Sequence, residues 1–272
     1  MIRSKSSWAE TVKQCQNISP KIANHGSSIL IETRDLKREI LLSEIFKSLG
    51  ISAGECDDKK LISSVSVLNS DGDAKALQFS TEPFYDDIKS ITIAPLGSIE
   101  HSNVFCFANP REIFFTIISW LSANVGFSSI FRSQISETSQ IHKSAIIAKS
   151  VSIGRNCLIG AGVVIYPNVQ IGNDCVIEAN TVIGNSGFGV IRGRESNIMI
   201  PHIGGVDIGN NVRLGALSTI DRGTIGVTSI GSFTKVDDKV HIAHNCRLGV
   251  RNIVCAGANV GGSVITGKDV WI

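Results

Sequence analysis

Residues 135–184 read, in groups of six, ISETSQ IHKSAI IAKSVS IGRNCL IGAGVV IYPNVQ IGNDCV IEANTV IG. An isoleucine opens every group, and a smaller residue stands four positions after it. These smaller residues are Ser139, Ala145, Val151, Cys157, Val163, Val169, Cys175 and Thr181. A period of six is neither the 3.6 of an α-helix nor the 2 of a β-strand. It is typical of a chain that turns a corner every six residues, so that three hexads close one coil of a parallel β-helix.

The same period continues beyond this stretch after two interruptions. Residues 185–205 break it with glycines, charged residues and a proline, and we expect a loop outside the coil there. The hexads resume at Ile208, and four extra residues follow Ile220 before the next group begins at Ile230. They run on through Val236, Ile242, Leu248, Val254, Val260, Thr266 and Ile272. The sequence stops within a rung and without the polar cap that ends a solenoid, so we expect a truncated chain or coils that a partner covers.

The overall composition restricts the class of protein more than its function. A hydrophobic fraction of 43% can bury a sizeable core, and a net charge of +2 gives no reason to expect a nucleic-acid partner. No apolar run approaches the length of a membrane span. The seven cysteines have no disulfide spacing, which favours reduced thiols in a compartment such as the cytoplasm. The basic, serine-containing N-terminus also resembles an organelle transit peptide, an alternative that stays open.

We predict four parts along the chain: an extension at 1–34, a small α+β domain at 35–125, a linker at 126–134 and the β-helix at 135–272. The extension shows no period, and we expect it to be poorly ordered. The linker contains glycine and serine, which suit a connection between two folded units.

The small domain is expected to hold two helices with short strands between them. Helical spacing predicts the first helix from Asp35 to Leu49, with Asp35 as its N-cap and Gly50 as its end. A second helix is expected from Pro110, with Asn109 as its N-cap, to about residue 122. Runs of strand-forming residues lie at 61–68, 76–79, 90–93 and 104–107.

Two histidines in adjoining hexads are the best candidates for chemistry. In the run His241-Ile-Ala-His-Asn245, Ile242 points inward in hexad phase, so His241 and His244 lie outside. One coil takes 18 residues, so Gly262 is expected to stack beside His244 on the same face. A base next to a backbone N–H that no side chain covers is the minimum apparatus for acyl transfer. A solvated surface histidine is the simpler alternative.

A metal site is a competing interpretation of the same histidines. His241 and His244 face different sides of one corner, and no cysteine or carboxylate completes a tetrahedral set for zinc. We therefore expect neither a metal nor another cofactor.

Four short motifs resemble those of a known family. They are residues 184–189 (GNSGFG), 200–204 (IPHIG), 219–223 (TIDRG) and 242–245 (IAHN), in that order. Together they resemble the UDP-3-O-(3-hydroxyacyl)glucosamine N-acyltransferases of lipid A biosynthesis, and the TIDRG run separates these enzymes from the related O-acyltransferases. Residues 79–85 (FSTEPFY) are similar to the family's uridine-binding segment. The likeness covers about residues 35–272.

The resemblance implies a fold, a reaction and roles for individual residues. The fold is a left-handed parallel β-helix (a hexapeptide-repeat solenoid) that assembles as a homotrimer. The substrate is a UDP-acyl-glucosamine, and the 3-hydroxyacyl donor is acyl carrier protein. His244 would be the general base that takes a proton from the glucosamine 2-amine, and the backbone N–H of Gly262 would hold the oxyanion. Phe79 and Tyr85 would sandwich the uracil, and the remaining candidate substrate contacts are His241 and Asn245.

Two departures from the family pattern leave the substrate open. Glu82 stands where the family usually has asparagine, and a carboxylate beside a nucleotide phosphate is unfavourable. Ser186 replaces the aspartate of the family's glycine-rich run. An acetyl-CoA-dependent N-acetyltransferase on another nucleotide sugar, and a non-catalytic trimeric scaffold or inactive copy, are kept as alternatives. A γ-type carbonic anhydrase is a more distant one.

Overall fold

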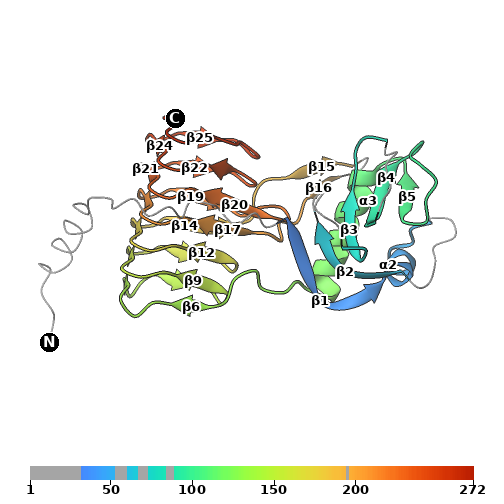
Figure 1. The fold of residues 1–272 in the computed structure, drawn as a ribbon, viewed down its shortest axis with the longest axis horizontal. Helices are drawn as coiled ribbons and strands as arrows, with labels where there is room; N and C mark the ends of the chain where they lie inside the picture. The colour runs from blue at the N-terminus through green and yellow to red at the C-terminus, as the bar shows by residue number, and fades with distance from the viewer. Residues whose placement is uncertain (1–31, 53–59, 67–72, 84–88, 194–195) are drawn as a thin grey trace, which may run out of the picture.

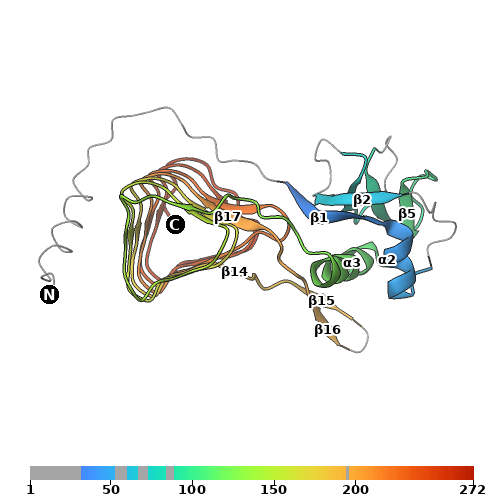
Figure 2. The ribbon, with the colours of Figure 1, turned by 90° about the horizontal axis from the view of Figure 1, so that it is seen from below.

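The computed structural model describes residues 32–52, 60–66, 73–83, 89–193 and 196–272, and Figure 1 shows them in two parts. One part is a prism of stacked strands, and the other is a sheet with two helices. Figure 2 shows the triangular outline of the coil. The prism is the predicted left-handed parallel β-helix. Most of the predicted extension, residues 1–31, lies outside the described residues.

Each face of the prism is a parallel sheet of six short strands. The first face contains β7 (Gln140–Ile141), β10 (Leu158–Ile159), β13 (Val176–Ile177), β18 (Arg213–Leu214), β21 (Lys235–Val236) and β24 (Ile253–Val254). The second contains β8 (Ile146–Ile147), β11 (Val164–Ile165), β14 (Val182–Asn185), β19 (Thr219–Asp221), β22 (His241–Ile242) and β25 (Asn259–Val260). The third contains β6 (Gln134–Ile135), β9 (Val151–Ile153), β12 (Val169–Ile171), β17 (Gly205–Ile208), β20 (Val227–Ile230) and β23 (Arg247–Leu248).

The strand register confirms the predicted coil length and both interruptions. In an undisturbed coil, Leu158 pairs with Val176, one coil of 18 residues further on. Across the first interruption, Val169 pairs with Val206, so the residues between are set outside the coil. Across the second, Ile208 pairs with Ile230, which accommodates the four extra residues.

The interior of the prism is built from the two hexad positions identified in the sequence. From Ile153 onward, the isoleucines that open the hexads form one continuous buried cluster with most of the smaller residues that follow them, and Ile141 and Ile147 pack against it. Cys157, Cys175 and Cys246 are fully buried among them as free thiols. A stack of small and β-branched side chains fills so narrow an interior without voids.

The second part is a sheet in the order β1-β2-β3-β4-β5, covered by two helices. β1 pairs antiparallel with β2, and the other pairs are parallel. The strands are β1 (Thr33–Leu41), β2 (Leu61–Ser66), β3 (Ala76–Phe79), β4 (Ile91–Pro95) and β5 (Val104–Phe107), and the helices are α2 (Leu42–Leu49) and α3 (Pro110–Asn124). The four predicted strands are present, and the end of the first run, 67–68, lies outside the described residues. The domain boundaries at 34, 125 and 134 stay predictions.

The prediction of a helix starting at Asp35 is wrong. Residues 33–41 form β1, and α2 begins only at Leu42. β1 is held on both sides, because Asp35 pairs with Ser64 of β2 and Leu36 bridges to Phe127. Such long-range pairing overrides local helical spacing. The predicted end at Gly50 is confirmed, since this residue has φ 64° and closes the helix.

The second helix begins at Pro110, as predicted, although Asn109 makes no side-chain capping hydrogen bond. The loop at 185–205 leaves the coil and carries a hairpin of β15 (Val190–Arg192) and β16 (Asn197–Met199). After the hairpin, Ile200 and Ile203 pack into the core of the small domain. The loop therefore joins the two parts of the structure (Figure 2).

Candidate active site

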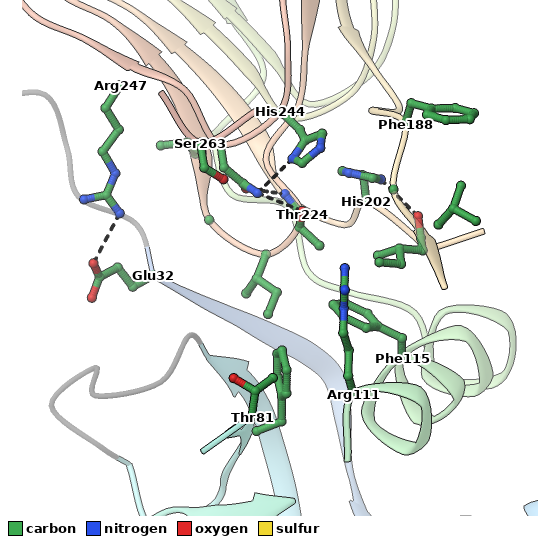
Figure 3. A pocket seen from close by; sticks show the side chains of 18 of the residues that line it. Glu32, Thr81, Arg111, Phe115, Phe188, His202, Thr224, His244, Arg247 and Ser263 are labelled. Atoms are coloured by element: carbon green, nitrogen blue, oxygen red, sulfur yellow. Dashed lines mark hydrogen bonds and ion pairs between the residues drawn. The ribbon is translucent and has the colours of Figure 1, made fainter. Parts of the chain in front are cut away.

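A pocket of about 730 Å³ lies where the prism, the 185–205 loop and the small domain meet (Figure 3). His244, Asn245 and Ser263 line it from the prism, and His202 and Phe188 line it from the loop. The small domain adds a third wall, formed by Phe79, Thr81, Arg111 and Phe115. The pocket therefore depends on residues that are far apart in the sequence.

His244 and Gly262 lie together, as the coil length predicts. A Cβ atom at Gly262 would come within 2.8 Å of Cε1 and 2.9 Å of Nε2 of His244. The imidazole thus occupies the space that a side chain at position 262 would need. The backbone N–H of Gly262 has no acceptor among the described residues, so it can donate to a ligand.

Asn245 fixes the ring of His244. Asn245 sits at a corner with φ 60°, a left-handed conformation that asparagine tolerates better than most residues. Its Oδ1 accepts a hydrogen bond of 2.7 Å from the backbone N–H of Thr224, so its amide nitrogen must face the other way. Nδ2 of Asn245 lies 3.0 Å from Nδ1 of His244. Since an amide nitrogen only donates, Nδ1 is the acceptor, and the neutral ring of His244 carries its proton on Nε2.

His202 belongs to the 200–204 motif and lines the pocket, although no role is predicted for it from the sequence. Its ring centroid lies 4.9 Å from that of His244. Nδ1 lies 3.0 Å from the carbonyl oxygen of Ile200. Burial is the main reason that the pKa of His202 falls to about 4, and the neighbouring His244 lowers it further. His202 is therefore neutral at physiological pH.

Gly187 allows the two imidazoles to approach each other. A Cβ atom there would lie 2.8 Å from Cδ2 of His244 and 2.9 Å from Nε2 of His202. Only a residue without a side chain fits between these rings, which gives a physical reason for the glycine in the 184–189 motif.

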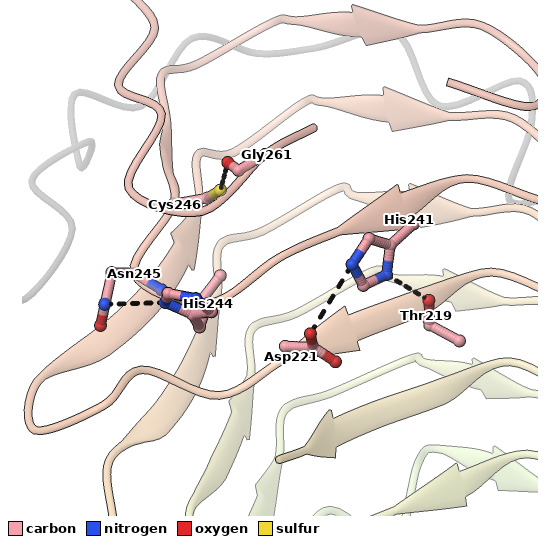
Figure 4. A network of polar contacts seen from close by, with 8 residues as sticks. Thr219, Asp221, His241, His244, Asn245, Cys246 and Gly261 are labelled. Atoms are coloured by element: carbon pink, nitrogen blue, oxygen red, sulfur yellow. Dashed lines mark hydrogen bonds and ion pairs between the residues drawn. The ribbon is translucent and has the colours of Figure 1, made fainter. Parts of the chain in front are cut away.

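His241 does not join this pocket. Its Nδ1 is hydrogen-bonded to Oγ1 of Thr219 at 2.8 Å, and its Nε2 lies 3.7 Å from Oδ2 of Asp221 (Figure 4). Burial raises the pKa of Asp221, and the nearby His241 and His244 act against that rise. Both histidines lie outside the coil, as predicted, but only His244 lines the pocket.

Phe79 lines the pocket from the end of β3, with one face of its ring already packed. It stacks on Phe114 at 4.6 Å and meets Phe115 edge-on at 5.6 Å. Tyr85, its predicted partner around the uracil, lies outside the described residues. Glu82, which departs from the family pattern, does not line the pocket, and its backbone is held in a turn by Ser80.

No group of three or more histidine, cysteine, aspartate or glutamate residues in the described ranges is arranged to hold a metal ion. The described helices include none that is both long enough and apolar enough to cross a membrane.

Part of the solenoid matches a known family model. Residues 132–166 and 150–185 match the bacterial transferase hexapeptide (six repeats) family model. The matched residues contain the coils that lead into the 185–205 loop.

The relatives that match this chain agree with the motifs. The chain is 38% identical over 109 residues to UDP-3-O-acylglucosamine N-acyltransferase 2 of Legionella pneumophila, which covers 40% of this chain and 28% of that one. It is 41% identical over 111 residues to UDP-3-O-acylglucosamine N-acyltransferase of Caulobacter vibrioides, which covers 41% of this chain and 32% of that one. The predicted resemblance is confirmed. The matches span less than a third of the length of these relatives.

Among solved structures, the chain is similar to the UDP-N-acetylglucosamine acyltransferase from Campylobacter jejuni. The TM-score is 0.38 at 24% identity, over 48% of this chain and 54% of that one. An overlap of this size supports no functional conclusion.

Proposed function

We propose that this chain is an N-acyltransferase that moves a 3-hydroxyacyl chain from acyl carrier protein to the 2-amine of a UDP-3-O-acyl-glucosamine. The observation that carries the proposal is the placement of His244 against Gly262, in a pocket that the small domain helps to form. The names of the relatives supply the substrate class, because they are UDP-3-O-acylglucosamine N-acyltransferases.

In the proposed reaction, the amine nitrogen attacks the thioester carbonyl carbon and forms the new C–N bond. The carbonyl oxygen becomes an oxyanion, to which the N–H of Gly262 donates. His244 takes the proton that the amine loses. The C–S bond then breaks, and the thiolate of the carrier takes this proton from the imidazolium.

The hydrogen bonds of His244 identify the nitrogen that acts as the base. The neutral ring has its lone pair on Nδ1, which accepts from the amide of Asn245. We infer that an N–H of the substrate amine takes the place of that amide N–H. A Cβ at Gly262 would lie 3.3 Å from Nδ1, so the proposed base and the proposed oxyanion donor are neighbours.

The small domain would bind the nucleotide. Phe79 lines the pocket and is proposed as one of the two rings around the uracil. Tyr85 is proposed as the second ring. Arg111, at the start of α3, lines the same pocket and makes no ion pair with another described residue. A cation there would favour a substrate that carries phosphate.

We also propose that the chain works as a homotrimer in a reducing compartment, for which the cytoplasm is the simplest choice. Large apolar side chains outside the coil support packing against other copies, since Ile146 is 64% exposed and Leu217 is 54% exposed. The described cysteines are all free thiols, which suits such a compartment.

A direct assay of the purified chain tests this function. It uses UDP-3-O-(3-hydroxyacyl)glucosamine as the acceptor, with 3-hydroxyacyl carrier protein or acetyl-CoA as the donor. We expect an amide product with the carrier-protein donor, and little with acetyl-CoA. Transfer from acetyl-CoA alone would assign the chain to the N-acetyltransferases. The absence of transfer from both donors, with no binding of uridine nucleotides by calorimetry, would contradict the proposal.

A further inference from the structure

One ring nitrogen of His202 is buried without a partner. The side chain is only 6% exposed, and Nδ1 donates to the carbonyl oxygen of Ile200, which can only accept. The proton is therefore on Nδ1, and Nε2 carries a lone pair. Nε2 has no hydrogen-bond partner among the described residues. Leaving a buried polar atom without a partner destabilises the fold, so a partner is to be expected.

The neighbouring ring can supply that partner. Because Asn245 donates to Nδ1 of His244, the neutral His244 ring carries an N–H on Nε2. A Cβ at Gly187 would lie 2.9 Å from Nε2 of His202 and 2.8 Å from Cδ2 of His244, the ring atom bonded to Nε2, so the lone pair and the N–H belong to neighbouring edges of the two rings. In Figure 3, the His202 nitrogen that does not contact Ile200 points toward the side of the pocket where His244 lies.

The distance between the rings suits a direct bond. The centroids are 4.9 Å apart, and the planes meet at 59°. An N–H···N bond of about 2.9 Å between two five-membered rings places their centroids roughly 5 Å apart. Gly187 puts no side chain between the rings. No hydrogen bond joins them in the structure as it stands, so one ring must turn slightly about its Cβ–Cγ bond while keeping its Nδ1 contact with Asn245 or Ile200.

We propose that His202 is a positioning residue for His244, and that its Nε2 accepts a hydrogen bond from the Nε2–H of His244. This inference rests on the proposed role of His244 as the base. In the protein without substrate, it completes a chain in which every donor has an acceptor, from Thr224 through Asn245, His244 and His202 to the carbonyl of Ile200. The acceptor that usually orients a catalytic base is a carboxylate, and here a neutral imidazole takes that place.

The bond would strengthen during the proposed reaction. When His244 takes the proton of the amine, its Nε2–H donates more strongly, because charge-assisted hydrogen bonds are the stronger ones. His202 can play this part because burial keeps it neutral. The other ionisable groups around the pair are Asp221, Arg222, His241, Arg111, Arg247 and Glu32.

Nitrogen NMR on the whole, unaltered chain tests the bond without any need for turnover. With ¹⁵N-labelled histidine, we expect His244 to be protonated on Nε2 and His202 on Nδ1. We also expect a scalar coupling between the two Nε2 nitrogens across the hydrogen bond. A His244 ring protonated on Nδ1 in the neutral form, or no coupling at low temperature, would overturn the proposal.

Two substitutions separate an acceptor from a space-filling ring. His202→Phe keeps a ring without the lone pair, so we expect the ¹⁵N signal of the His244 Nε2–H to lose its hydrogen-bonded shift. The value of kcat should fall about 10-fold, because the ring of the base is no longer held in place. His202→Gln offers an amide oxygen and should restore most of both quantities, whereas the control His142→Phe, outside the pocket, should change neither. An unchanged Nε2 signal of His244 in a folded His202→Phe protein would contradict the proposal even if acyl transfer itself were never detected.

Discussion

The imidazole of His244 occupies the space that a side chain at Gly262 would fill, because a Cβ there would lie 2.8 Å from Cε1 of the ring. The ring and the bare N–H one coil away are therefore positioned together. This relationship follows from the parallel register in which His241 pairs with Asn259 and Ile242 with Val260. A change at either residue is expected to disturb the other.

Gly262→Ala should displace the ring of His244 and lower the rate of acyl transfer about 100-fold, since small misplacements of a catalytic group have effects of this size. The thermal midpoint should change little, because the ring borders an open pocket. Neighbouring Gly261→Ala is the matched control, as a Cβ there meets nothing within 4 Å. Equal rates for the two variants, measured under single-turnover conditions, would show that the space at residue 262 is not used by the base.

Asn245→Ala should lower kcat by about 10-fold to 100-fold, because it frees the ring of His244 and leaves the N–H of Thr224 without its acceptor. Asn156→Ala is the control for backbone strain, because Asn156 has nearly the same left-handed φ, 57°, at a corner far from the pocket. Both variants are expected to lose a similar amount of stability, as measured by thermal denaturation. A similar loss of activity in both would mean that Asn245 acts only through the fold.

Protein stability should fall as the pH drops from about 6.5 toward 4. The pKa of His202 is lowered from 6.5 to about 4 in the folded protein, so the unfolded chain binds the proton first. The loss from this one residue is at most about 3 kcal/mol, and it is absent above pH 6.5. Urea denaturation across this range should therefore show a weaker pH dependence in His202→Gln than in the wild type. An identical dependence would contradict the burial of His202 as a neutral ring.

Phe79→Leu should weaken the binding of uridine nucleotides several-fold, because an aromatic face contributes about 0.5–1.5 kcal/mol beyond its buried area. The substitution keeps an apolar side chain against Phe114, with which Phe79 stacks. Phe107→Leu is the control, since Phe107 packs edge-on against Phe46 and does not line the pocket. Calorimetry with UDP measures the effect, and unaltered UDP affinity in Phe79→Leu would remove Phe79 from the nucleotide site.

Most of the solenoid could be predicted from the sequence, because its core repeats every six residues and each inward position is decided locally. The placement of Gly262 beside His244 followed from the same count. β1 could not be predicted in this way, since Asp35 and Leu36 take their strand conformation from partners at Ser64 and Phe127. Helical spacing was present in that segment, and long-range pairing overrode it.

The pocket was less predictable from the sequence than the solenoid. His202 lies within the 185–205 insertion, which has no period, and its burial depends on Ile200 and Ile203 docking into the core of the small domain. Hexad phase also placed His241 and His244 outside the coil without showing which of them faces the pocket. That distinction comes from Asp221 and Thr219, which engage His241 on its own strand face.

The most direct test of the proposed function compares the rates of amide formation by His244→Ala and His241→Ala. Both variants remove a histidine from the same corner of the prism, and only His244 lines the pocket. With the 3-hydroxyacyl carrier-protein donor, we predict at least a 100-fold loss for His244→Ala with an unchanged thermal midpoint, and a rate near that of the wild type for His241→Ala. Wild-type activity in His244→Ala would contradict the assignment of His244 as the general base of the proposed acyl transfer.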